Sequence, residues 1–73
     1  MLSEKMRRIA ANEVVTEDSV LSPGVVELCS GMVTGCYHLN EELPFTEWIG
    51  GTIIIMNDND NCLRAFKNGN LIK

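Results

Sequence analysis

The chain has 73 residues and a net charge of −4, with 45% apolar and 22% charged residues. This composition is typical of a globular domain and excludes the polar, highly charged profile of a disordered chain. Its length predicts a single domain over residues 1–73, and domains this small often depend on disulfides, metals or a partner chain for stability.

Charge and hydropathy also exclude several partners. Ten acidic residues outnumber six basic ones, and no basic run is longer than Arg7-Arg8, so we expect no nucleic-acid binding. The longest apolar stretch, 53–56, is far shorter than the roughly 20 residues of a membrane helix, so we expect no membrane span. The N-terminus does not have the pattern of a secretion signal. With three cysteines, an odd number, the chain fits a reducing compartment, and we expect a cytoplasmic protein.

Residues 1–12 are compatible with either a helix or a strand. Met6 and Ile9 recur at helical spacing behind Ser3, a candidate N-cap. The β-branched run 14–16 that follows disfavours a helix, because branched side chains lose rotamer freedom there. We therefore favour a strand from Met6 to the end of this run.

Residues 25–39 carry the clearest hairpin signal, two β-type runs joined by Ser30-Gly31. A regular ladder from this two-residue turn places Cys36 opposite Val25 and turns His38 away from the core. The more apolar face, which we expect to point to the core, carries Val26, Leu28, Val33, Gly35 and Tyr37.

The same register argues against a disulfide between Cys29 and Cys36. In a regular ladder they share a face but lie four residues apart along the strand, which is about 13 Å. A disulfide requires Cα atoms within roughly 7 Å of each other. We expect no bridge between them.

The connector 40–47 is polar, yet it contains one of the two phenylalanines and leads into the only tryptophan. Aromatic residues in a connector typically pack on the core or on a partner. Both positions fit Phe45 and Trp48, with the core preferred. Together with His38 and Tyr37, they are the candidate interaction residues of the chain.

The second half of the chain contains one continuous apolar run. Gly50-Gly51 leads into residues 52–56, which predict a central strand buried on both faces. The segment 57–61 that follows has no apolar residue and predicts a solvated loop.

A second hairpin signal closes the chain at Asn68-Gly69, where both residues accept a positive φ. The expected register pairs Phe66 with Leu71 and Ala65 with Ile72. Five or six short antiparallel strands joined by tight turns predict an all-β fold, either a small β-sandwich or an open barrel. Bare sheet edges in such a small fold favour pairing with a second copy.

Metal-ligating residue types are few and scattered. The zinc-type candidates are Cys29, Cys36, His38 and Cys62, which lack the paired short spacings of a zinc site. Asp58 and Asp60 alternate with amide side chains, but their loop lacks the glycine and the distal glutamate of a calcium loop. We expect no metal and no cofactor.

Catalytic patterns are missing in the same way. His38 is the only histidine, and Cys36 on the same strand is poorly placed to hydrogen-bond to it. The acidic residues Glu41, Glu42 and Glu47 are not gathered into a cleft by any pattern in the sequence. We therefore name no catalytic residue and expect the chain not to be an enzyme.

Two stretches resemble metal-dependent amidohydrolases. Residues 8–16 followed by 24–33 are similar to the opening of those enzymes, where a strand ending in a Val-Val-Thr type run precedes a hairpin. Residues 63–72 are similar to their closing hairpin. The resemblance implies the small composite β-sandwich that the two ends of those enzymes form, with the catalytic barrel absent. Because no His-x-His follows Gly50-Gly51, no catalytic residue of the family is carried over.

These observations predict a non-catalytic β module that self-associates or docks on another protein. A strand edge and the connector from Phe45 to Trp48 would provide the contacts. The alternative is a small-ligand or metal-binding protein that uses Cys36, His38 and the acidic connector at a subunit interface.

Overall fold

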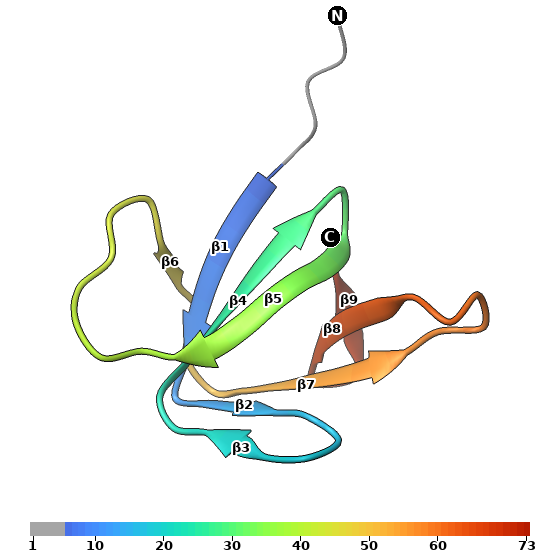
Figure 1. Ribbon diagram of the computed structural model, residues 1–73, viewed down its shortest axis with the longest axis horizontal. Coiled ribbons are helices and arrows are strands. Elements are labelled where there is room, and N and C mark those ends of the chain that lie inside the picture. The colour runs from blue at the N-terminus through green and yellow to red at the C-terminus, as the bar shows by residue number, and fades with distance from the viewer. Residues whose placement is uncertain (1–5) are drawn as a thin grey trace, which may run out of the picture.

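The computed structural model describes residues 6–73, and all regular structure in this range is β (Figure 1). Sheet A has the order β5-β4-β1-β6 and sheet B the order β3-β2-β7-β8-β9. Sheet A consists of β1 (Met6–Ala11), β4 (Gly24–Cys29), β5 (Met32–His38) and β6 (Glu47–Trp48). Sheet B consists of β2 (Glu13–Val15), β3 (Val20–Leu21), β7 (Thr52–Asn57), β8 (Leu63–Lys67) and β9 (Asn70–Ile72).

The predicted all-β class is confirmed, and the sheets do not close into a barrel. The described part of the ambiguous first segment is strand, while the candidate N-cap Ser3 lies outside the described residues. Two strand pairs, β1–β6 and β2–β7, are parallel, whereas the sequence predicted antiparallel strands. Parallel pairs join segments that are distant in the sequence, so turn signals do not reveal them.

The core lies between the two sheets and is wholly apolar. No polar or charged residue of the described chain is buried. The core cluster consists of Ile9, Ala11, Val14, Val26, Leu28, Ile53, Ile55 and Ala65. Because side chains alternate along each strand, one face of each sheet supplies this cluster and the other face points outward.

Two segments cross together from sheet A to sheet B, and this crossing is the corner of the fold. β1 continues into β2 through Asn12, and β6 continues into β7 through residues 49–51. Gly51 donates its backbone N–H to Asn12 Oδ1 at 2.7 Å, and its carbonyl accepts from Glu13 N at 3.1 Å. Before the crossing, Ile49 N donates to Ala10 O at 2.9 Å. Backbone pairing therefore continues through the corner.

A third crossing, from β3 to β4, requires a glycine. The chain passes through Ser22-Pro23, whose peptide bond is cis, and enters β4 at the buried Gly24. A Cβ atom on Gly24 would lie 2.7 Å from Cγ2 of Val14 and 2.9 Å from Cβ of Leu21. The two sheets approach so closely here that a side chain does not fit.

The hairpin at Ser30-Gly31 is confirmed, but its register shifts by one residue. Cys29 pairs with Met32 and Leu28 with Val33, as expected; the ladder is then irregular at Thr34, and Cys36 pairs with Val26. The predicted pairing of Cys36 with Val25 is therefore wrong. One extra residue in a strand is a β-bulge, and it turns every later side chain to the opposite face.

Because of the bulge, three side chains lie on the opposite face of the sheet from the one predicted. Tyr37, predicted to face the core, pairs with Val25 on the outer face of sheet A. His38, predicted to face away, pairs with Gly24 on the side of the core and lies exposed at the strand end. Cys36 packs partly buried against the core and no longer shares a face with Cys29. No disulfide joins these two cysteines.

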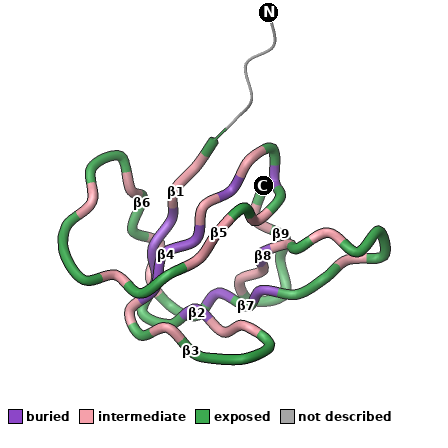
Figure 2. Tube along the Cα trace, viewed as in Figure 1, coloured by how far each residue is buried: buried purple, intermediate pink, exposed green. Residues whose placement is uncertain are grey.

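The strand β7 is buried on one face only, so the prediction of burial on both faces is wrong. Ile53 and Ile55 are buried, whereas Ile54 is 46% exposed and Met56 is 47% exposed. Figure 2 shows this alternation along β7. In a fold of two layers each sheet has a single covered face, so a continuous apolar strand must expose every second side chain.

The C-terminal hairpin agrees with the prediction in full. Phe66 pairs with Leu71 and Ala65 with Ile72. Asn68 and Gly69 both have positive φ, 54° and 80°, which is the conformation a two-residue turn of this kind demands. Local turn chemistry alone determines this register.

We predict that Gly24→Ala destabilises the protein and Gly35→Ala does not. The added methyl group of Gly24→Ala would overlap buried Val14, and overpacking of this kind costs about 1–3 kcal/mol. A Cβ on Gly35 would meet nothing within 4 Å, which makes Gly35→Ala a matched control in the adjacent strand. Urea unfolding followed by circular dichroism measures both variants. Equal stability of the two would contradict the close approach at Gly24.

Candidate functional site

The outer face of sheet B carries an apolar row that crosses all of its strands. Successive pairings link β3 to β2, β2 to β7, β7 to β8, and β8 to β9. The residues they place side by side, which we call the apolar row, are Val20, Val15, Ile54, Phe66 and Leu71. Residues paired across a sheet point to the same face, so these side chains form one band.

The apolar row is open to solvent over much of its length. Val20 is 55% exposed, Ile54 46% and Leu71 44%, and Met56 adds a further exposed apolar side chain two residues along β7. Single exposed apolar residues are ordinary, but a contiguous band of them marks an interaction surface. Glu13 lies at one flank of the row, in register with Thr52, and Arg64 lies at the other, in register with Met56.

The sequence did not single out the apolar row, because its members come from five short segments. No stretch of ten residues contains more than two of them. The available signal was the apolar run 52–56 combined with the expected two-layered fold, in which each sheet has one uncovered face. That combination requires Ile54 and Met56 to face outward.

The connector between β5 and β6 holds the most exposed aromatic side chain of the described residues. Phe45 is 95% exposed and has a positive φ of 58°, and Trp48 is 58% exposed. The preferred prediction, that this pair packs in the core, is therefore wrong. The interface alternative stays a prediction.

The four candidate interaction residues do not form one cluster. Tyr37 and Trp48 fall in one row on the outer face of sheet A, separated by the buried Val25 and Ala10. Phe45 lies in the connector beyond that row. His38 is on the other side of the sheet, where Nδ1 lies 2.8 Å from Asn40 Oδ1.

Polar groups on the outer face of sheet A are paired with one another. Tyr37 donates its hydroxyl proton to Oε2 of Glu27 at 2.7 Å, and Arg8 Nε donates to the same oxygen at 3.2 Å. The hydrogen bond to Glu27 is the main reason why the pKa of Tyr37 is raised. On the inner face of sheet A, in register with Leu28 and Ile9, Arg7 and Glu47 form a second ion pair with an N–O distance of 2.9 Å. Its hydrogen bond lowers the pKa of Glu47.

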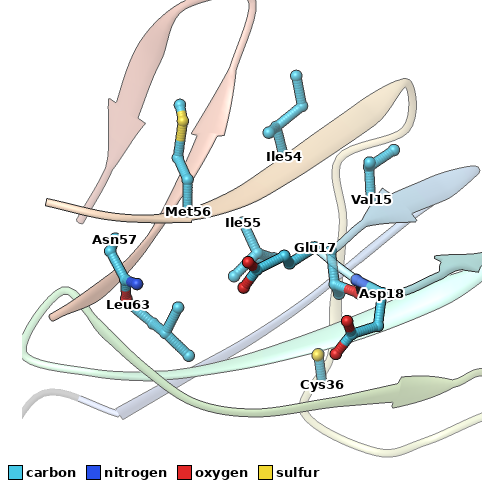
Figure 3. Close-up of a pocket in the computed structure, with 10 residues that line it drawn as sticks. Val15, Glu17, Asp18, Cys36, Ile54, Ile55, Met56, Asn57 and Leu63 are labelled. Atoms are coloured by element: carbon cyan, nitrogen blue, oxygen red, sulfur yellow. Dashed lines mark hydrogen bonds between the residues drawn. The ribbon is translucent and has the colours of Figure 1, made fainter. Parts of the chain in front are cut away.

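A cleft of about 480 Å³ opens where β2 ends beside β7 (Figure 3). One wall is the turn 16–18 after β2, and the other is the C-terminal half of β7. Cys36 of β5 and Leu63 of β8 complete the lining, which is more apolar than polar. Figure 3 shows the carboxylates of Glu17 and Asp18 on the cleft side of the turn.

The loop 57–61 is a hydrogen-bonded turn built around Asp58. Its carboxylate accepts from the backbone N–H groups of Asp60 and Cys62 through Oδ1, and from Arg64 Nε through Oδ2 at 2.9 Å. The Arg64 hydrogen bond is the main cause of the lowered pKa of Asp58. The side chain that a calcium ion would require is already engaged within the chain.

Within residues 6–73, no group of three or more His, Cys, Asp or Glu side chains is arranged to hold a metal ion. No helix long and apolar enough to cross a membrane occurs in the same range.

Comparison with known proteins yields one structural likeness. No family model matches the sequence, and no curated protein matches it significantly. The fold is similar to part of a mutant N-acetyl-D-glucosamine-6-phosphate deacetylase from Mycobacterium smegmatis, solved in complex with N-acetyl-D-glucosamine-6-phosphate. The TM-score is 0.55 and the identity 19%, over 71% of this chain and 13% of that one. The deacetylase is an amidohydrolase, so the likeness agrees with the resemblance in sequence at the level of the fold.

We predict that Asp58→Asn removes an acid-sensitive part of the protein's stability. A carboxylate whose pKa falls on folding stabilises the folded state fully above its unfolded pKa, near 3.8, and this contribution disappears as the pH falls through the lower, folded pKa. The difference in melting temperature between the wild type and Asp58→Asn should therefore be constant near neutral pH and shrink in acid.

Asp60→Asn is the control in the same turn, because only the backbone of Asp60 takes part in the hydrogen bonds described. Thermal unfolding followed from neutral pH to strong acid measures all three proteins. A difference that stayed unchanged down to the lowest pH would show that the Asp58–Arg64 pair does not carry the effect.

Proposed function

We propose that this chain is a non-catalytic β module that self-associates by placing the outer faces of two B sheets against each other. The observation that carries the proposal is the apolar row, which crosses five strands with its side chains in register. A face of this composition is typical of a sheet that is covered by another layer. Here the second copy of the same face provides that layer.

Burying the partly exposed side chains of the apolar row would stabilise a dimer. Ile54 is 46% exposed, and burying what remains of such a side chain contributes about 1 kcal/mol. A two-fold interface counts each residue twice, so Ile54 alone contributes about 2 kcal/mol to a dimer, or roughly thirtyfold in its Kd.

A two-fold axis along the apolar row would place each strand over its own copy with the direction inverted. The chain carries a net charge of −4, and two copies repel each other over most of their surface. The row itself has no charged side chain, so contact through it brings no like charges together.

The likeness in fold is compatible with a role in assembly. The chain resembles a β unit that makes up 13% of a much longer enzyme chain. In this proposal the β unit provides a surface for assembly.

We expect the protein to be a dimer whose mass falls toward 8.1 kDa on dilution or on substitution of the row. Ile54→Thr keeps a β-branched residue in the strand and removes the apolar contact, so it should weaken the dimer roughly thirtyfold. Size-exclusion chromatography with light scattering over a concentration series measures the Kd of each variant.

Two controls separate this face from the others. Met32→Thr alters an exposed apolar residue of sheet A, and Phe45→Ser removes the most exposed aromatic residue of the connector. Both should dimerise as the wild type does. A wild type that is monomeric at every concentration would refute the proposal, and dissociation by Phe45→Ser instead of Ile54→Thr would move the interface to the connector.

A further inference from the structure

We propose that the cleft beside β7 binds an extended peptide carrying a basic residue, which adds to sheet B as a short parallel or antiparallel strand. The site is the gap left where β2 stops at Val15 while β7 continues to Asn57.

The backbone of β7 is available along this gap. Among the residues that the structure describes, no strand pairs with Ile55–Asn57 on the side of β2. Gly51 directs its carbonyl to Glu13 of β2, and backbone groups of alternate residues point to the same side of a strand. By the same alternation the Ile55 N–H points to the carbonyl of Val15 at the end of β2, and the Ile55 carbonyl and the backbone groups of Asn57 point into the gap. An unpaired edge of this kind is a template for an added strand.

The walls of the cleft suit apolar side chains on both faces of such a strand. Ile54 and Met56 line it on one side of β7, while Ile55 and Leu63 line it on the other. Cys36 of sheet A adds a further lining group from across the sandwich. Successive side chains of an extended peptide point alternately to two sides, so both would find apolar contacts.

Charge adds a specific requirement. Glu17 and Asp18 line the cleft from the turn that replaces β2, and the lining includes no basic side chain. A peptide that continues the line of β2 runs directly past this turn. A lysine or arginine at that position would pair with the two carboxylates, whereas an acidic peptide would be repelled.

The dimensions fit a short segment. The three residues of β7 beyond its pairing with β2 correspond to about 10 Å of strand. The cleft volume of about 480 Å³ lies within the range of sites that hold small ligands. The cleft shares Val15 and Ile54 with the apolar row, whereas Glu17, Asp18 and Leu63 lie outside it.

The test is a titration of isotope-labelled protein with the blocked peptide Lys-Val-Ile-Val-Lys, followed by amide NMR. We expect shifts concentrated on residues 55–57 and on the turn 16–18. Two N-methylated versions, one for each set of alternate amides, separate strand addition from simple apolar contact. Methylation of the set that faces β7 should abolish binding, and methylation of the other set should leave it intact.

Charge-reversed variants test the acidic rim. Glu17→Lys combined with Asp18→Lys should weaken binding roughly tenfold, whereas Glu41→Lys combined with Glu42→Lys makes the same change of charge on the connector and should have little effect. No shifts at residues 55–57, equal binding of both N-methylated peptides, or equal weakening by the two double variants would each overturn the proposal. Repeating the titration with Leu71→Thr, which weakens the dimer at a row residue that does not line the cleft, distinguishes failure of the peptide site from failure of the dimer.

Discussion

The paired crossing at Asn12 and Gly51 is the constraint on which the rest of the structure depends. Two strands leave sheet A side by side and enter sheet B side by side, and the Asn12 side chain bonds to the Gly51 backbone where they turn. Lys67 Nζ donates to the carbonyl of Ile49 at 2.6 Å, which ties β8 to the same corner. The angle between the sheets, and so the shape of the core, is set at this point.

Turn chemistry in the sequence was enough to predict much of the local structure. Ser30-Gly31 and Asn68-Gly69 are both hairpin turns, and the second hairpin has the expected register throughout. The bulge at Thr34 was not predictable, because Thr34 has no distinctive conformational preference. The bulge results from how β5 fits against β4. The two parallel pairs were equally hidden, since their partners lie far apart in the sequence.

The surface was harder to predict than the fold, for a reason that the bulge and β7 share. Whether a side chain faces the core depends on its position in a ladder and on the number of layers, and neither is a property of the residue itself. Tyr37 was assigned to the wrong face by a shift of one residue. Ile54 was assigned to the interior because its neighbours are apolar on both sides, although the described residues form only two layers and leave it exposed. The apolar row is the consequence of that geometry.

The parallel pairs also determine the order in which the fold can assemble. β1 and β2 lie near the start of the chain, but their parallel partners are β6 and β7, which follow the whole β4–β5 hairpin and the connector. Closing so long a loop costs entropy before any of these contacts forms, and folds dominated by distant pairings fold slowly. As the chain emerges during synthesis, β1 can pair with β4 at once, whereas β2 has only the two residues of β3 beside it until residues 52–54 follow. The apolar face of the first strands therefore stays exposed to solvent until the second half of the chain has been synthesised.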